Sequence, residues 1–195
     1  MEADAAHAHL AVRRLTDFSQ VEELYRTRMK RDFARNERRP LASLRRSWKR
    51  GAYECFGLFD GDAILGYAFF VRLGKDYLFD YFAIAEEHRD EGLGSLFLRE
   101  LTAQLSDADC VVLEVEDPDR AKNASERALR ERRLRFYLRS GYRETDLTAR
   151  LFGADYRILE APTASPHPTQ ALRAVYIALY QSILPGLLFR TQLRM

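Results

Sequence analysis

Cysteine is scarce in this chain of 195 residues, which has only Cys55 and Cys110. Two cysteines cannot build a disulfide scaffold, and both lie in apolar surroundings, so we expect buried free thiols in a reducing compartment. Long apolar runs are scarce as well, and the segment from Met1 to His9 contains none of the length that a signal peptide needs. The sequence therefore predicts a cytoplasmic protein.

Histidine is also rare, and its four positions are scattered along the chain: His7, His9, His88 and His167. They show neither the spacing of metal ligands nor a recognisable Ser/His/Asp arrangement. No Gly-Lys pair is followed by Ser or Thr, which excludes a Walker A phosphate-binding loop. We therefore expect neither a bound metal ion nor a hydrolytic triad.

The composition is otherwise that of a globular protein, because 47% of the residues are apolar and 31% are charged. Lys and Arg (31) nearly balance Asp and Glu (29), giving a formal charge of +2, but the charges are segregated. Residues 26–50 hold eleven basic and two acidic residues, 76–119 hold thirteen acidic and two basic, and 120–143 hold nine basic and two acidic. Such blocks are either solvated helix faces or binding surfaces, and the sequence leaves both interpretations open.

The hydrophobic pattern predicts strands and helices in a mixed order. Strands are expected at 10–15, 53–59, 64–73, 77–85, 110–115, 142–150 and 151–159. Helices are expected from Phe18 through Met29, over 41–49, after Gly94 through Leu105, from Asn123 to Ser140 and over 171–184. Asp60-Gly61-Asp62 predicts a β-hairpin turn between the second and third strands. This order favours a layered sheet with helices on both faces.

A glycine loop between the fourth strand and a helix carries the most distinctive chemistry, His88-Arg89-Asp90-Glu91-Gly92-Leu93-Gly94-Ser95. Backbone N–H groups and the helix dipole converge at such a turn and attract a phosphate, and glycine lets a pyrophosphate approach the main chain. A Rossmann dinucleotide loop fits poorly, although Glu114 lies twenty residues after Gly94. Phe97 occupies the position of the third glycine, where a small residue is required, and the strand does not open the fold.

The remaining interpretation is the acyl-CoA loop R-x-x-G-x-G, which begins here at Arg89. Together with the strands Asp80–Ile84 and Leu113–Glu116 and the later segment F-Y-x-x-x-G-Y from Phe136 to Tyr142, it resembles the GNAT N-acetyltransferase superfamily. The resemblance covers about residues 10–159. It implies an α/β (α+β) fold with a mixed, mostly antiparallel central sheet of six to seven strands, helices on both faces and an added C-terminal helix.

The resemblance also implies where acetyl-CoA binds. The pyrophosphate would lie on the loop amides, and the end of the preceding strand would offer main-chain groups to the pantetheine arm. The implied cofactor-binding residues are Phe82, Ala83, Ile84, Arg89, Asp90, Glu91, Gly92, Leu93, Gly94 and Ser95. Asp90 and Glu91 depart from the family, which commonly places glycine and a basic residue there. Their carboxylates repel a diphosphate unless they point into solvent.

Three residues are candidates for catalysis. The resemblance assigns Tyr137 to protonation of the departing thiolate, which suits a phenol with a pKa near ~10; the alternative is a core aromatic residue on an amphipathic helix. Glu114 and Glu116 have the same parity on one strand, so both are expected on one face, where they could attract a cationic amine and relay its proton. Asp80 is a third candidate base. Each carboxylate could instead form an ordinary ion pair with the arginine-rich helix that follows.

The predicted function is transfer of an acetyl group from acetyl-CoA to a primary amine of a small molecule or protein, by direct attack in a ternary complex. Two alternatives remain. A catalytically weak CoA-binding or sensor module would keep the fold without turnover. A nucleic-acid-binding protein could use the basic segment 26–50, in which Tyr25, Phe33 and Trp48 are interleaved, although a basic patch is not a recognition motif. We therefore expect no nucleic acid as partner.

The domain organisation is predicted as an acetyltransferase domain over 1–160, a proline-rich linker over 161–170 and a helical extension over 171–195. The apolar surface of the last helix suggests packing on the domain or on a second subunit, as in a homodimer. A membrane span is not expected, because Arg173, Gln181 and Pro185 interrupt the run of roughly 20 apolar residues that a span requires.

Overall fold

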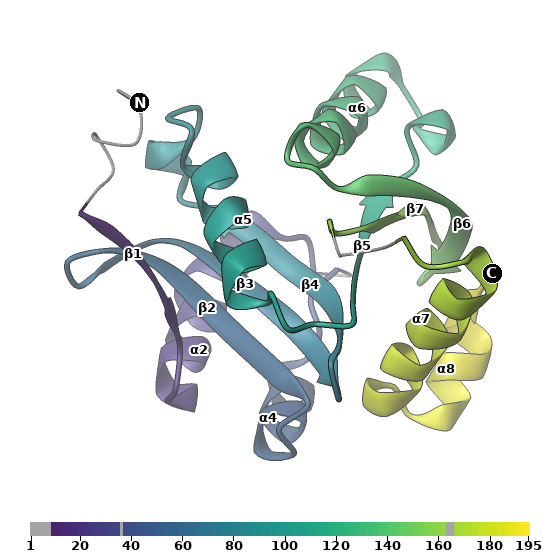
Figure 1. Ribbon diagram of the computed structural model, residues 1–195, viewed down its shortest axis with the longest axis horizontal. Coiled ribbons are helices and arrows are strands. Elements are labelled where there is room, and N and C mark those ends of the chain that lie inside the picture. Colours follow the sequence, from purple (N-terminus) through teal and green to yellow (C-terminus); the bar gives the residue numbers. More distant parts are fainter. Residues whose placement is uncertain (1–8, 36, 163–165) are drawn as a thin grey trace. The chain divides into compact units, whose positions relative to one another are not determined.

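The computed structural model describes residues 9–35, 37–162 and 166–195, and His7 and part of the predicted linker lie outside them (Figure 1). The chain divides into two compact units. The N-terminal unit comprises Met1–Phe70 and Tyr81–Gln104, and the C-terminal unit comprises Val71–Asp80 and Leu105–Met195. Strands β3 (Ala63–Leu73) and β4 (Asp76–Ile84) therefore contribute residues to both.

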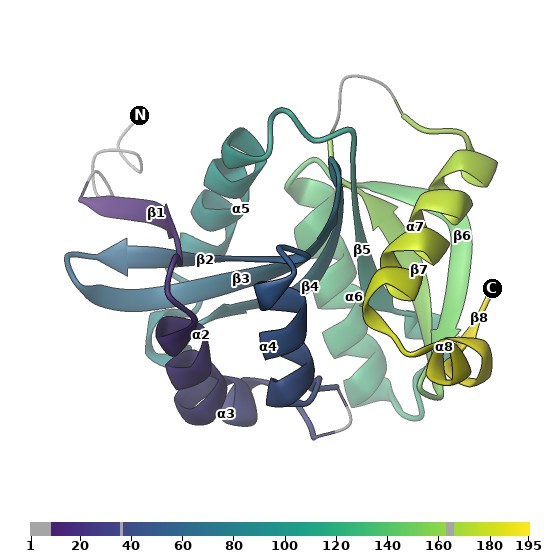
Figure 2. The same cartoon turned by 90° about the horizontal axis from the view of Figure 1, so that it is seen from below.

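The N-terminal unit has a three-layered arrangement. Its elements are β1 (Leu10–Arg14), α2 (Phe18–Leu24), a π-helical turn (Tyr25–Met29), α3 (Lys30–Asp32), α4 (Leu41–Lys49), β2 (Tyr53–Asp60), the first part of β3, the end of β4 and α5 (Leu93–Gln104). Figure 2 shows α5 on one face of strands β1, β2 and β3, and α2 and α4 on the other. This confirms that helices cover both faces of the sheet in this unit.

The first helix forms where the sequence places a cap and an apolar stripe. The Asp17 carboxylate accepts the backbone N–H of Ser19 at 2.9 Å, which satisfies one of the free donors at the helix start. Val21, Leu24 and Met29 recur at helical spacing and are at most 4% exposed. The helical hydrogen bonding changes to the π-helical pattern at Tyr25 and back at Lys30, so the helix expected from Phe18 through Met29 runs on to Asp32.

The C-terminal unit contains the rest of the sheet. Its elements include β5 (Cys110–Glu116), α6 (Ala124–Arg139), β6 (Arg143–Leu151), β7 (Ala154–Glu160), α7 (Thr169–Ile183), α8 (Gly186–Gln192) and β8 (Leu193–Arg194). β4 pairs with β5 in parallel from Asp76↔Cys110 to Phe79↔Leu113, whereas β5–β7, β6–β7 and β6–β8 are antiparallel. In Figure 1, α6 lies on one side of β5, β7 and β6, and α7 and α8 lie on the other.

Helix α6 begins and ends at the predicted residues. The Asn123 side chain accepts the backbone N–H of Glu126 at 2.9 Å, and the Glu126 carboxylate accepts the N–H of Lys122 at 2.7 Å. This reciprocal capping satisfies donors at the helix start. Gly141 follows the last turn with a φ of +88°, a left-handed conformation that glycine adopts without strain.

The sheet has eight strands in the order β1-β2-β3-β4-β5-β7-β6-β8, rather than the six to seven expected. The difference lies in the segment after Pro185, beyond the last predicted helix (171–184), where no strand was expected. It forms α8 and then β8, which pairs with β6 through Arg150↔Arg194 and Leu151↔Leu193. A strand of two residues has no hydrophobic alternation of its own, so only its partner strand reveals it.

The two cysteines and the last long helix, α7, can also be compared with the predictions. Cys55 and Cys110 are buried free thiols, as predicted. Helix α7 packs on β5 and β6 of the same chain. Among the helices that the structure describes, none combines the length and the apolar character needed to cross a membrane.

Candidate functional site

The glycine loop leads directly into the first turn of α5. After β4, a short 3-10 turn (Glu86–His88) precedes the loop, and the helix begins at Leu93. Gly92 has a φ of +82°, and its carbonyl accepts the N–H groups of Ser95 (3.1 Å) and Leu96 (3.2 Å). The N–H groups of Leu93 and Gly94 therefore precede the first intrahelical donors, and such groups bind anions together with the helix dipole.

The two acidic residues of the loop are both exposed. Asp90 adopts a φ of +66°, which is uncommon for a residue other than glycine. The Glu91 carboxylate lies 3.2 Å from Nδ1 of the neighbouring His88. The sequence predicted repulsion of a diphosphate unless these carboxylates face solvent. Both are exposed, and solvent screens exposed charges, so their repulsion of a diphosphate at the loop amides is weakened.

The end of β4 is held tightly against β3 and α5. The rings of Phe82 and Phe97 lie 5.5 Å apart between centroids. The N–H of Ala85 donates to the carbonyl of Leu65 at 2.7 Å. A Cβ atom at Gly66 would lie 2.6 Å from Cδ1 of Ile84 and 3.0 Å from the carbonyl oxygen of Ala83, so a larger residue would have to displace the Ile84 side chain and crowd the β4 main chain. These contacts fix the main chain that the sequence assigns to the pantetheine arm.

A buried carboxylate next to the loop arginine was not foreseen. The Asp32 side chain is 2% exposed, and its Oδ2 accepts the hydroxyl of Tyr67 at 2.8 Å. Burial, and then the Asp32 charge, raise the pKa of Tyr67 well above its ordinary value. The other oxygen, Oδ1, lies 3.6 Å from Arg31 Nε and 3.8 Å from Arg89 Nη2 and has no hydrogen-bond partner among the described residues. In the sequence, Asp32 is distinguished only as an acidic residue within the strongly basic segment 26–50.

Tyr137, in the C-terminal unit, is half-buried among aromatic rings. Its ring centroid lies 5.2 Å from that of Phe136, 5.6 Å from Tyr142 and 6.5 Å from Phe79. Burial raises the pKa of Tyr137 to about 12, while the charge of Arg133 acts in the opposite direction. The phenol therefore keeps its proton at neutral pH, which is required of a proton donor and is also true of a core tyrosine.

Glu116 forms ion pairs with helix α6. Its carboxylate lies 3.0 Å from Arg130 Nη2 and 3.2 Å from Arg133 Nη1. Arg130 also pairs with Glu126 at 2.7 Å and donates to the carbonyl of Asp117 at 2.8 Å. For Glu116, the sequence left open a catalytic role or an ordinary ion pair with the arginine-rich helix that follows. In this structure, Glu116 makes such ion pairs with α6.

Glu114 has different partners on a different helix. Its Oε1 accepts the hydroxyl of Tyr180 at 2.7 Å and also that of Tyr176. Burial, followed by the Glu114 charge, holds the pKa of Tyr176 well above its ordinary value. The two carboxylates of β5 are therefore engaged by α7 and α6 respectively. Asp80, the third candidate base, is half-buried on β4.

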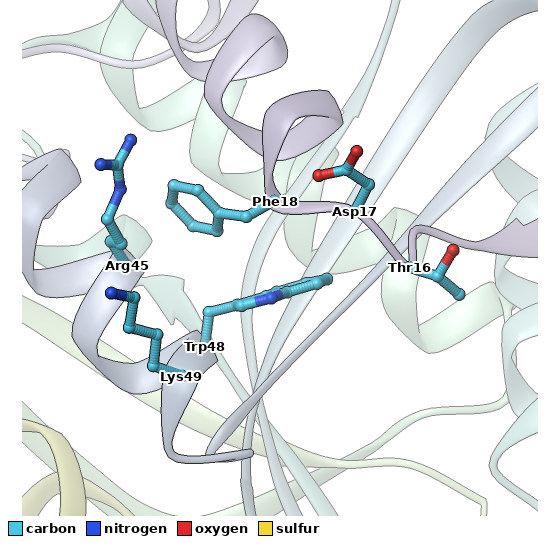
Figure 3. Close-up of a pocket in the computed structure, with 6 residues that line it drawn as sticks. All are labelled: Thr16, Asp17, Phe18, Arg45, Trp48 and Lys49. Atoms are coloured by element: carbon cyan, nitrogen blue, oxygen red, sulfur yellow. The ribbon is translucent and has the colours of Figure 1, made fainter.

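A surface pocket of about 460 Å³ lies at helices α2 and α4 of the N-terminal unit (Figure 3). It is lined by Thr16, Asp17, Phe18, Arg45, Trp48 and Lys49, none of which is a predicted site residue. Phe18 and Trp48 contact each other edge to face at 5.8 Å, and the Arg45 guanidinium lies 5.1 Å from the Phe18 ring and pairs with Glu22. Arg45 and Trp48 of the basic segment thus contact side chains of α2.

The sequence was compared with protein-family models. The model of the acetyltransferase (GNAT) family matches residues 18–142, which is more than half of the chain. The chain belongs to the GNAT acetyltransferase family. The match includes the R-x-x-G-x-G loop and ends at Tyr142, the last residue of the F-Y-x-x-x-G-Y segment, so the family predicted from these motifs is confirmed.

Solved structures with the GNAT fold resemble this chain over most of its length. A GNAT-family protein from Bacteroides thetaiotaomicron is 22% identical with a TM-score of 0.68, covering 88% of this chain and 96% of its own. The ribosomal-protein-S18-alanine N-acetyltransferase from Escherichia coli is 16% identical with a TM-score of 0.59, covering 82% and 97%. An aminoglycoside 6′-N-acetyltransferase complexed with coenzyme A is 13% identical with a TM-score of 0.57, covering 81% and 99%. A comparison with curated proteins finds no match.

Proposed function

We propose that this GNAT-family chain transfers an acetyl group from acetyl-CoA to a primary amine. The observation that carries the proposal is the turn at Gly92, where the N–H groups of Leu93 and Gly94 precede the first intrahelical donors of α5. These groups, with Arg89, would hold the diphosphate of the acyl carrier. A similar solved structure in complex with coenzyme A supports the choice of carrier.

The reaction proposed is direct attack of the amine on the thioester. The acceptor ammonium must first lose a proton, because only the free amine has a lone pair. Its nitrogen then forms a bond to the acetyl carbonyl carbon, the carbon–sulfur bond breaks, and the thiolate of CoA leaves. Tyr137 would donate its phenolic proton to that thiolate. Glu116 and Glu114 are the proposed bases, with Asp80 as a third candidate.

The acceptor class is either a small molecule or a protein terminus. Among the similar structures, one is named for the alanine of ribosomal protein S18 and another for an aminoglycoside. This range is expected of a fold in which the carrier site is constant and the acceptor surface varies. The alternative of a CoA-binding sensor without turnover shares the carrier site and differs only in the chemical step.

The decisive experiment is a calorimetric titration with acetyl-CoA, followed by a panel of amines with release of the CoA thiol as readout. Binding and amine-dependent thiol release are expected. Binding without release for any small amine or peptide would favour the sensor alternative. Absence of binding, together with retardation of nucleic acid at physiological salt, would instead favour the basic segment 26–50 as the functional surface.

Asp90→Asn is expected to tighten acetyl-CoA binding. The substitution removes one negative charge beside the proposed diphosphate site, and asparagine tolerates the left-handed φ of +66° as well as aspartate does. We expect roughly a twofold to fivefold lower Kd at low salt and a smaller effect at high salt, because Asp90 is exposed. Calorimetry at two salt concentrations measures this, with Asp107→Asn as the matched control. An unchanged Kd at low salt would show that Asp90 is electrostatically remote from the carrier.

Glu116→Gln tests the base assignment. If Glu116 accepts the ammonium proton, the acid limb of the kcat/KM profile should shift and the plateau should fall about a hundredfold. The matched control is Arg133→Gln, which removes one ion-pair partner of Glu116 and retains the carboxylate. An unaltered profile in Glu116→Gln would transfer the role to Glu114 or Asp80.

A further inference from the structure

Three side chains from distant parts of the C-terminal unit meet in its interior. Cys110 begins β5, Glu160 ends β7, and His167 lies two residues before the start of α7. One ligand atom of each, a thiol sulfur, a carboxylate oxygen and an imidazole nitrogen, lies within 4.8 Å of the other two. Glu160 Oε1 is 2.5 Å from His167 Nδ1. The side chains of Glu160 and His167 are 1% and 29% exposed, and Cys110 is fully buried.

The Cys110 thiol points to a missing partner in this cluster. It is fully buried, and no hydrogen bond from or to its sulfur is found within residues 9–35, 37–162 and 166–195. Polar groups in such surroundings ordinarily have a partner. A thiol and an imidazole that lie this close to a carboxylate can coordinate one metal cation together with it, once they have lost their protons.

The surrounding charge is negative. Besides burial, the carboxylates of Glu160, Asp76 and Asp109 raise the pKa of the Cys110 thiol to about 12. Arg143 pairs with Glu160 and offsets one of these three charges. A divalent cation would neutralise the excess and would stabilise the thiolate that the carboxylates alone disfavour.

We propose that Cys110, Glu160 and His167 bind a zinc ion. Thiolate, imidazole and carboxylate are the ligands that zinc takes in proteins, and the soft thiolate disfavours magnesium and calcium. On binding, the Cys110 S–H bond breaks and its proton passes to solvent. The proton between Glu160 Oε1 and His167 Nδ1 passes to Nε2 of the same ring, or to solvent if the ring was doubly protonated, and the ion takes its place. Three protein ligands leave one coordination position to water.

Such an ion would tie the segment before α7 to two strands of the sheet. Because zinc would bind the folded arrangement and not the unfolded chain, it would raise the stability of the C-terminal unit. The ligands are 50 and 7 residues apart in the sequence, so they form no recognisable spacing motif. For this reason the sequence predicted no metal.

Cobalt(II) is the probe that tests the thiolate ligand directly. The purified full chain is treated with a chelator, freed of it, and titrated with CoCl2 while the absorption spectrum is recorded. We expect one equivalent of Co²⁺ to produce a thiolate-to-cobalt charge-transfer band together with visible bands of a four-coordinate ion. Cys110→Ser should abolish the charge-transfer band, and Cys55→Ser, which removes the other buried thiol, should retain it. A titration without this band, or with a band that Cys110→Ser leaves unchanged, overturns the proposal.

Zinc affinity gives a second readout that does not depend on the folding of a core variant. His167→Gln changes a half-exposed side chain, and we expect it to raise the Kd for Zn²⁺ at least about tenfold, since even loss of an outer-shell partner costs that much. The melting temperature of the full chain and of Cys55→Ser should rise with ZnCl2, and that of His167→Gln should rise less. Equal Zn²⁺ affinity in the full chain and His167→Gln would show that His167 is only a hydrogen-bond partner of Glu160, and would overturn the proposal.

Discussion

Tyr137→Phe is expected to lower kcat for acetyl transfer about a hundredfold or more, while the Kd for acetyl-CoA changes less than about twofold. The ring would keep its contacts with Phe79, Phe136 and Tyr142, and only the proton donor would be lost. Steady-state kinetics with thiol release and calorimetry with acetyl-CoA separate the two quantities. Tyr142→Phe, in the same aromatic cluster, is the matched control and should retain kcat.

The pH dependence of this effect has a definite sign. Because burial raises the pKa of Tyr137 to about 12, the phenol is protonated throughout the neutral and mildly alkaline range. Its ionisation therefore removes the proton donor only as the pH approaches 12, and kcat should not fall near pH 10 on its account. A fall of kcat near pH 10 that disappears in Tyr137→Phe would contradict this, as would unchanged turnover in the variant at pH 7.

Glu114→Ala is expected to lower the free energy of unfolding by about 2–5 kcal/mol. The substitution leaves the hydroxyls of Tyr176 and Tyr180 without their shared acceptor, and both side chains are at most 1% exposed. Urea denaturation of the full chain measures the change. Tyr180→Phe removes one donor and leaves Glu114 paired with Tyr176, so it should cost only about 1 kcal/mol. A loss below about 1 kcal/mol in Glu114→Ala would show that α7 does not depend on this carboxylate.

A third variant separates the structural role of Glu114 from a catalytic one. Glu114→Gln retains an oxygen that can accept a phenolic hydroxyl but cannot take up a proton from an ammonium. If Glu114 only anchors α7, this variant should be more stable than Glu114→Ala and should retain kcat. If it is the base, kcat should fall while the free energy of unfolding stays close to that of the unchanged chain.

The fold follows closely from local patterns in the sequence. The caps at Asp17 and Asn123 and the glycine at 141 act within a few residues of the chain, so their effect can be predicted without knowing the tertiary structure. The same holds for the turn at Gly92, which was predicted from a glycine loop between a strand and a helix and which leads directly into α5. The exception was β8, whose two residues pair with residues of β6 that lie 42 and 44 positions away in the sequence.

The partners of the candidate site residues could not be predicted in this way. The parity of Glu114 and Glu116 predicted one shared face, but Glu114 meets tyrosines of α7 and Glu116 meets arginines of α6. The sequence does not encode locally how these two helices pack. Asp32 was missed for the same reason, since the hydroxyl that its buried carboxylate accepts belongs to Tyr67, 35 residues away on β3. Long-range side-chain pairs are set by tertiary packing, which periodicity does not report.

The buried carboxylate of Asp32 is an ion-pair partner for Arg89 within the protein itself. Under the proposed function, a diphosphate that draws the guanidinium toward the loop would compete with a buried negative charge 3.8 Å away, and Oδ1 of Asp32 would keep Arg31 as its neighbour. This competition would weaken loading of the carrier and favour departure of the spent carrier, because Asp32 would recapture the arginine. Where release of the product limits turnover, such an intramolecular competitor would shorten the time that each spent carrier stays bound.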